Sequence, residues 1–199
     1  MDIDAQFRSL RDLIRWIDEN TKGIEISGGH REQIASACFD VAIEHQAAIA
    51  ILCDSKLFGS MHALMRVLIE SLVRGLWLLH CATDAELERF EKRGIEKHFG
   101  DMTEEIEAAI GAYQPTLSQM KKNAWGPLND FTHTGYIQVT RRHGNGALGS
   151  NYPVADVIKC LNASGAYGLI ASAQLAAMAK NNDLVQAHLI KMQEYASVP

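Results

Sequence analysis

The stretch MRVLIESLVRGLWLLH, residues 65–80, decides the fold class of this chain. Its apolar residues recur at helical spacing, but Arg66, Glu70 and Arg74 interrupt them at steps of four residues. Side chains four residues apart lie on nearly the same side of a helix, so the three charges form a ladder. An otherwise apolar helix with such a ladder is expected inside a helical bundle, where its charges face polar groups on neighbouring helices.

The rest of the chain also shows helical periodicity, and no convincing period-two strand appears. We expect a long irregular loop over 135–152 and a kink or break of the sixth helix at Trp125-Gly126-Pro127. The segment Thr83-Asp84-Ala85-Glu86 predicts a capping box at the start of the fourth helix. The predicted helices cover residues 4–20, 30–57, 60–82, 84–98, 103–112, 115–133, 153–180 and 183–196. The prediction is therefore an all-α fold, an antiparallel helical bundle of seven to nine helices, in a single domain over 1–199.

Composition points to a protein of the cytoplasm. The 199 residues are 47% hydrophobic and carry a net charge of −5, which argues against a broad basic face for nucleic acid. The first twenty residues are charged throughout, so no secretory signal is expected. Residues 63–81 come closest to a membrane span, but the charge ladder interrupts them, and no membrane association is expected. The four cysteines form no C-x-x-C pair and are expected to be free thiols.

The predicted helix over 153–180 is rich in alanine, glycine and serine. Small residues let helix backbones approach closely, so we expect this helix to be central in the bundle or to face a second copy. A homodimer is accordingly the expected assembly.

Three predicted helices carry a polar stripe at four-residue spacing. Ser36, Asp40 and Glu44 mark the second helix, His62 extends the ladder of the third, and Asn129 and His133 mark the sixth. The simplest packing of antiparallel neighbours places these stripes around one point, with Glu44, Arg66, Glu70, Arg74, Asn129 and His133 together. Two interpretations stay open: a buried ion-pair network that fixes the helix register, or a polar pocket with a histidine for acid–base chemistry.

The loop over 135–152 contains Arg141, Arg142 and His143, with Tyr136 and Tyr152 nearby. Two arginines beside a histidine can hold a phosphate or an RNA backbone, although a solvated loop is the commoner explanation. No Glu-x-x-His, His-Glu-x-x-His or phosphate-binding glycine loop occurs, so neither a metal site nor a cofactor is expected.

The run ALMRVLIESLVRGLWL follows EHQAAIAIL and precedes NDFTH. Over about 30–135 this pattern resembles a group of bacterial helical proteins of unknown function, loosely similar to AbiV-type abortive-infection proteins and to HEPN domains. Helical ribonucleases of the HEPN type carry an arginine four to six residues before a histidine, as Arg74 and His80 do here, and Arg93 and His98. Two such matches are near the chance level for a chain with eight histidines. The positions that match the group are Glu44, Arg66, Glu70, Arg74 and His133.

The resemblance implies an all-helical, often dimeric protein connected with phage defence. One hypothesis is therefore a protein that binds or cleaves RNA or a nucleotide. Its catalytic residues would be His133, Arg74, Glu70 and His80, and its ligand-binding residues Glu44, Arg66, Asn129, Arg141 and Arg142. The alternative is a non-catalytic helical scaffold or small-ligand-binding bundle with a structural ion-pair seam. Whether the protein is an enzyme is left open.

Overall fold

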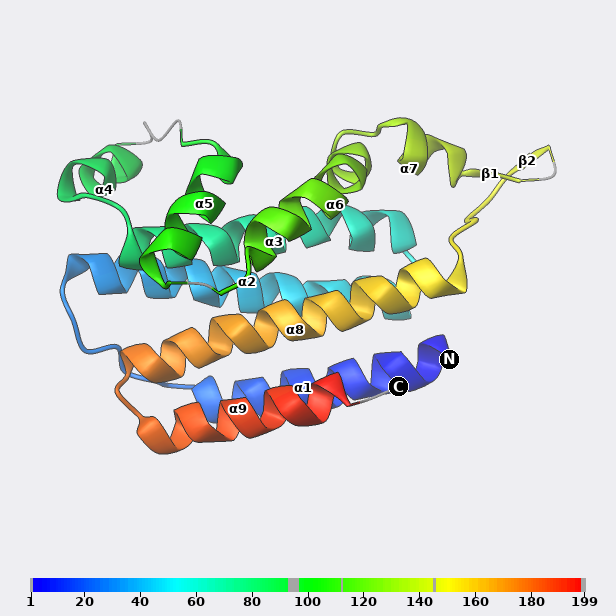
Figure 1. The fold of residues 1–199 in the computed structure, drawn as a ribbon. Coiled ribbons are helices and arrows are strands. Elements are labelled where there is room, and N and C mark those ends of the chain that lie inside the picture. The colour runs from blue at the N-terminus through cyan, green and yellow to red at the C-terminus, as the bar shows by residue number, and fades with distance from the viewer. Residues whose placement is uncertain (1, 93–96, 112, 145, 198–199) are drawn as a thin grey trace.

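The computed structural model describes residues 2–92, 97–111, 113–144 and 146–197. These residues form nine helices and one short hairpin, so the predicted all-α bundle is confirmed (Figure 1). The elements are α1 (Ile3–Thr21), α2 (His30–Asp54), α3 (Phe58–His80), α4 (Asp84–Glu91), α5 (Phe99–Ala109), α6 (Thr116–Thr132), α7 (Tyr136–Thr140), β1 (His143–Gly144), β2 (Ala147–Leu148), α8 (Val154–Met178) and α9 (Asn182–Ala196).

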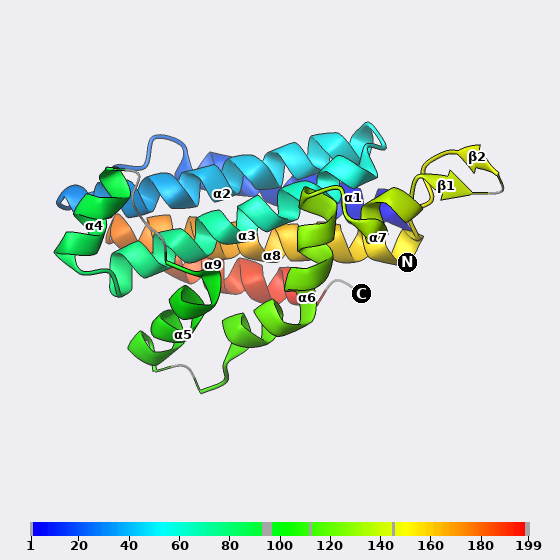
Figure 2. The same ribbon diagram turned by 90° about the horizontal axis from the view of Figure 1, so that it is seen from above.

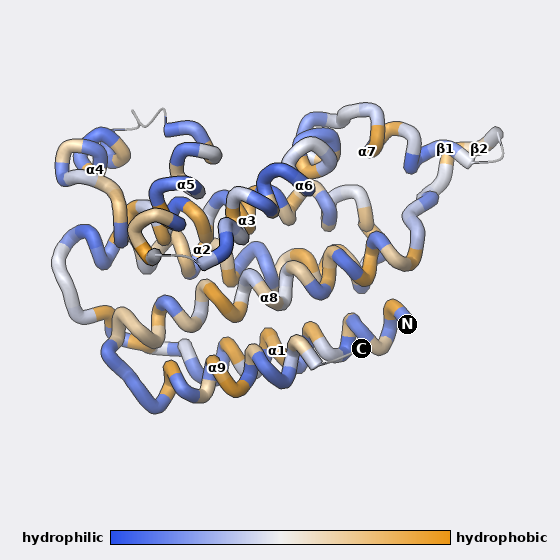
Figure 3. The backbone as a smooth tube through the Cα atoms, viewed as in Figure 1, coloured by the Kyte–Doolittle hydropathy of each residue, from blue (hydrophilic) through white to orange (hydrophobic). Residues whose placement is uncertain are grey.

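The long helices pack in layers with α8 in the middle. Helix α8 contacts α1, α2, α3 and α9, and α2 packs along α3. The shorter helices α5 and α6 lie against the outer side of α3, as Figures 1 and 2 show from two directions. Orange and blue residues follow one another along the outer helices in Figure 3, which is the pattern of amphipathic helices around a shared core.

The prediction that the small-residue helix is central in the bundle is confirmed. Glycines in α8 and α3 leave room for larger side chains: Gly165 packs against Tyr195 of α9, and Gly168 against Gln46 of α2. In α3, a Cβ atom on Gly75 would lie 2.6 Å from a ring carbon of Phe39, so only glycine fits there without movement. Close helix contacts within one chain therefore account for these small residues.

Several helix ends differ from the prediction. Helix α2 ends at Asp54 and α3 already begins at Phe58, because Lys56 adopts a left-handed conformation that separates them. The predicted capping box is confirmed: the Thr83 hydroxyl accepts from the backbone N–H of Glu86, and the Glu86 carboxylate accepts from Thr83. The fourth helix ends at Glu91 rather than at residue 98, and α5 begins four residues earlier than predicted.

The second half of the chain is more regular than the sequence suggests. Helix α6 continues through Pro127 instead of breaking there, and Pro115 is the residue before the helix rather than its first residue. The predicted loop over 135–152 contains the short helix α7 and the hairpin β1–β2. The sequence missed this hairpin because its strands are only two residues long and show no alternation.

Within the described residues, α2 is the one helix long and apolar enough to cross a membrane by the criteria of length and composition. The sequence analysis expected no segment to meet these two criteria, and α2 corrects that expectation. Asp40 and Glu44 interrupt the helix, but its alanines and isoleucines keep the average apolar. In the bundle α2 packs against α3 and α8, and the same criteria are met by core helices.

Candidate functional site

A pocket of about 510 Å³ lies between α3, α6 and α8. We call it the α6 pocket. Most of its wall is apolar, and its polar groups come from His62 on α3, Asn123 on α6, Arg141 after α7, and Asp156 and Lys159 near the start of α8. The apolar part of the wall includes Met65, Ile69, Met120, Leu128, Phe131, Ile137 and Ala163.

His62 is the most buried polar group in this wall, with 8% of its surface exposed. Its ring belongs to a cluster of three: its centroid is 4.7 Å from that of Phe131 and 5.5 Å from that of Tyr152, on which it stacks, and the Phe131 and Tyr152 centroids are 6.3 Å apart. The Nδ1 atom is 2.7 Å from the carbonyl oxygen of Phe58, and because a carbonyl only accepts, Nδ1 carries the proton. The backbone of Asp156 is a second hydrogen-bonding neighbour of the ring.

Burial lowers the pKa of His62 below its ordinary value of 6.5, because water cannot solvate the imidazolium ion there. The Phe58 carbonyl and the backbone and carboxylate of Asp156 act in the opposite direction, and the positive charge of Arg141 adds to the lowering. The His62 side chain is therefore a neutral hydrogen-bonding group near neutral pH.

An ion pair stands at one edge of the pocket. The Nη2 atom of Arg141 lies 2.9 Å from an Asp156 carboxylate oxygen, and both side chains remain partly exposed, at 33% and 39%. Lys159, one helical turn after Asp156, is exposed at the same edge. With two cations, one carboxylate and a neutral imidazole, this edge carries a net positive charge.

Two further wall residues keep their protons. Burial raises the pKa of the Cys160 thiol and of the Tyr167 hydroxyl, since neither anion would be solvated. Cys160 is therefore a small apolar wall residue and not a nucleophile.

Part of the predicted polar seam forms between α3 and α6. Arg66 Nε donates to Glu70 at 2.9 Å, and its Nη1 lies 2.6 Å from Nε2 of His133. Its guanidinium also lies 5.1 Å from the centroid of the Trp125 ring. Since arginine only donates, His133 accepts through Nε2 and carries its proton on Nδ1. The cluster lies near the surface: Arg66 is 20% exposed, Glu70 27%, and His133 belongs to the exposed class.

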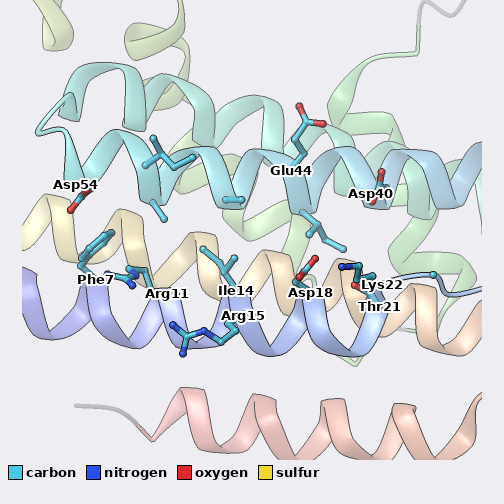
Figure 4. Close-up of a pocket in the computed structure, with 15 residues that line it drawn as sticks. Phe7, Arg11, Ile14, Arg15, Asp18, Thr21, Lys22, Asp40, Glu44 and Asp54 are labelled. Atoms are coloured by element: carbon cyan, nitrogen blue, oxygen red, sulfur yellow. The ribbon is translucent and has the colours of Figure 1, made fainter.

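The structure does not bring the rest of the seam to this point. Glu44 lies in a groove between α1 and α2 (Figure 4), because it is about 200° around the helix from Ala42 and Gln46, which face the core. Arg74 is two turns further along α3 than Arg66, and its guanidinium lies 6.0 Å from the centroid of the Phe90 ring. A stripe on a helix 23 residues long meets different neighbours at each turn.

The remaining predicted residues lie apart from one another. His80 ends α3, about 20 Å along the helix from Arg66, and is exposed. Asn129 lies in α6 with its side-chain oxygen buried and without a hydrogen-bond partner among the described residues. Arg141 lines the α6 pocket, whereas Arg142 is exposed. Arg93, of the second arginine–histidine match, lies outside the described residues.

Sequence reasoning missed the two groups that define the pocket edge. The sequence analysis placed His62 one turn before Arg66 in the charge ladder, but its burial against Phe131 and Tyr152 depends on tertiary packing. For Asp156 the sequence offered only its position in the first turn of a predicted helix, which does not indicate a binding site. Among the described residues no group of three or more histidine, cysteine or carboxylate side chains is placed to hold a metal ion.

Comparison with known proteins gives one match. No curated protein and no solved structure matches the chain. A family model described as a family of unknown function, DUF6988, matches residues 39–198, a range that includes the whole α6 pocket. Its description names neither abortive-infection proteins nor HEPN domains, so that resemblance stays a prediction. The chain belongs to the DUF6988 family of unknown function.

Proposed function

We propose that this protein binds a small, largely apolar molecule with an anionic end in the α6 pocket. The observation that carries the proposal is an apolar pocket of about 510 Å³ with a few polar groups gathered at one edge. Ligand sites typically measure roughly 300–1,000 Å³ and combine an apolar lining with a small number of placed polar groups. This is the small-ligand-binding alternative of the sequence analysis, and it requires no catalysis.

The wall chemistry suggests how such a ligand would lie. Its apolar body would contact Met65, Ile69 and Leu128, which contribute only hydrocarbon or thioether surface. Its anionic end would lie near Arg141 and Lys159, since these outnumber the single carboxylate at that edge.

The polar atoms set the ligand's orientation. Arg141 and Lys159 would fix the anionic end, while the His62 ring is already engaged by the backbone of Phe58 and of Asp156. The ligand would therefore take its direction from its anionic end, and His62 would contribute contact surface.

The test uses decanoate as a probe, with binding measured by titration calorimetry. We expect wild-type binding, loss of binding in Ala163→Phe, which fills the pocket, and binding weakened by about fivefold to tenfold in Lys159→Glu. Arg8→Glu on α1 makes the same charge change away from the pocket and should bind as wild type does. Equal binding by Ala163→Phe and wild type would place the probe elsewhere and contradict the proposal.

A second candidate is RNA binding or cleavage at the Arg66–Glu70–His133 cluster. One observation favours it: a guanidinium, a carboxylate and an imidazole meet at one partly exposed point. The imidazole could exchange a proton with a ribose hydroxyl while the guanidinium contacts a phosphate. His80 and Arg74 are too far along α3 to join, so this version of the RNA hypothesis needs fewer residues than the sequence suggested.

The RNA candidate is tested with a labelled single-stranded RNA, scored for binding and cleavage. His133→Ala should abolish cleavage, and His143→Ala, an exposed histidine on the hairpin, should leave it unchanged. Absence of binding and cleavage by the wild-type protein would dismiss this candidate without affecting the pocket proposal. The location in the cytoplasm and the connection with phage defence stay predictions from the sequence.

A further inference from the structure

One side of the α6 pocket is formed by a very short element. Helix α7 has 5 residues, whereas the other walls come from α3, α6 and α8, which have 23, 17 and 25 residues. Ile137 of α7 and Arg141, directly after it, belong to the wall. A helix this short is not stable by itself in water, so contacts with the rest of the molecule must hold α7 in place.

On the side of α6, a single residue holds the first end of α7. The main-chain oxygen of Asp130 accepts from the N–H of Gly135 at 2.7 Å, and its carboxylate accepts from the N–H of Ile137 at 3.0 Å. Thr134, between the two helices, has a left-handed conformation with a φ of 55°. The turn at Thr134 and Gly135 is therefore the point about which α7 can swing, since a few residues between elements absorb such a motion.

On the side of α8, an ion pair holds the other end of α7. Nη2 of Arg141 lies 2.9 Å from a carboxylate oxygen of Asp156, which is in the first turn of α8. Among the described residues no other ion pair joins the segment 135–142 to α8. Both side chains are partly exposed, and ion pairs at such positions contribute little to stability. A ligand can therefore replace this contact at small cost.

The outer face of α7 is not packed against other elements. Tyr136 is 80% exposed and Val139 44% exposed. Figures 1 and 2 show α7 at the edge of the molecule beside α6, away from the layer of α1 and α9. Segments with few buried apolar contacts are those that open locally while the rest of a protein stays folded.

We propose that α7 is a lid on the α6 pocket, that the Arg141–Asp156 ion pair is its latch in the empty protein, and that the carboxylate of a bound ligand replaces Asp156 on Arg141. The inference rests on the proposed function and names the ligand class as a monoanionic carboxylate. The ligand offers the Arg141 guanidinium the same two oxygens that Asp156 offers. The lid then closes over the ligand instead of over an empty pocket.

The charges at this edge agree with such an exchange. Lys159 follows Asp156 by three residues on α8, and side chains at this spacing are neighbours on a helix surface. Asp156 can therefore pair with Lys159 once the ligand occupies Arg141. With one ligand carboxylate the edge holds two cations and two carboxylates, so none is left without an opposite charge, whereas a dianion would add an excess negative charge.

The first test needs no ligand and measures hydrogen exchange of the full chain over residues 135–142 by mass spectrometry. Asp156→Ala and Arg141→Gln break the latch from opposite sides, and both should raise the exchange rate there about fivefold or more. Asp183→Ala removes an exposed carboxylate from the first turn of α9 and should exchange as wild type does. Equal rates in wild type and in both latch variants would overturn the lid and leave the pocket proposal intact.

The second test repeats the exchange measurement with a saturating probe. Decanoate should restore slow exchange in Asp156→Ala, because its carboxylate replaces the missing one, but not in Arg141→Gln, which lacks the cation. Decan-1-ol has the same hydrocarbon chain without the charge and should restore slow exchange in neither variant. In calorimetry Asp156→Ala should bind decanoate about fivefold more tightly than wild type, since the competing carboxylate is gone.

The outcomes separate this inference from the function on which it rests. Absence of decanoate binding by wild-type protein would contradict the proposed function, and the exchange of partners on Arg141 with it. Decanoate binding that fails to slow exchange in Asp156→Ala would overturn the latch alone. Equal slowing in Asp156→Ala and Arg141→Gln would also overturn it, because the ligand would then hold the lid without Arg141.

Discussion

The α6 pocket and the groove of about 740 Å³ between α1 and α2, the α1–α2 groove, differ in the state of their charges. In the pocket, Arg141 and Asp156 already form an ion pair, and the buried His62 is hydrogen-bonded to the backbone. In the groove, Arg11, Lys22, Glu44 and Asp54 have no ion-pair partner among the described residues.

This difference sets what a substitution should do in each hollow. Polar groups that are already satisfied leave a small ligand to fill apolar space and add one or two polar contacts. Unpaired, exposed charges such as Glu44 can change without breaking an ion pair, so substitutions in the groove should cost little stability. The predictions below test this contrast, beginning with the largest expected effect.

The largest effect is expected from removing wall atoms at a buried position. Met65 is 4% exposed and belongs to the core, so Met65→Ala should lower the free energy of unfolding by about 2–5 kcal/mol. Ile51→Ala in the groove removes a side chain that is 67% exposed and should change it by less than about 0.5 kcal/mol. Urea unfolding of both variants and the wild type gives both values. Similar losses for the two variants would mean that the groove is structurally part of the core.

A pH dependence should follow from the buried imidazole of the pocket. The pKa of His62 is lowered in the folded chain, so below about pH 6.5 the unfolded chain binds a proton that the folded chain does not. Stability is therefore full above this pH and declines as the pH falls from there to the lowered pKa. In His62→Gln the free energy of unfolding should fall less steeply as the pH is lowered, which measurements at several pH values would show. His188, whose pKa is also lowered by burial, contributes a separate part that His188→Gln removes.

A smaller effect is expected at the surface cluster between α3 and α6. A double-mutant cycle of Arg66→Gln and Glu70→Gln should give a coupling of about 0.3–1 kcal/mol, as for other helix pairs four residues apart at partly exposed sites. His133→Ala should cost less than about 1 kcal/mol, because the imidazole is exposed. A loss of several kcal/mol for His133→Ala would show that the cluster is buried in solution.

The smallest effect on folding should come from Glu44→Gln. Its carboxylate is exposed and makes no ion pair within the described residues, so the unfolding free energy should stay within about 0.5 kcal/mol of wild type. Urea unfolding of this variant beside the wild type gives the value. A larger loss would assign Glu44 a role in the packing of α1 on α2.

The helices were predictable because their signals are local. The capping box before α4 and the small residues of α8 each lie within one helix and were interpreted correctly, whereas the ladder in α3 predicted the helix but not all the neighbours of its charges. Helix ends were less predictable where backbone conformation decides them, as at Lys56. The site was only partly predictable, because the direction of each stripe depends on which neighbour covers that turn. Arg66 and His133 do meet, but Glu44 and Arg74 face other helices.

Pro127 has a consequence for recognition in the α6 pocket. Proline has no N–H group, so the main-chain oxygen of Asn123, four residues earlier, cannot receive the bond that a helix normally provides. Both residues line the pocket. A carbonyl group without its usual helical hydrogen bond therefore belongs to a residue of the wall, and no exchange of the Asn123 side chain removes it. A ligand N–H or O–H group that bonded to the Asn123 carbonyl oxygen would then depend on Pro127, one helical turn further along α6.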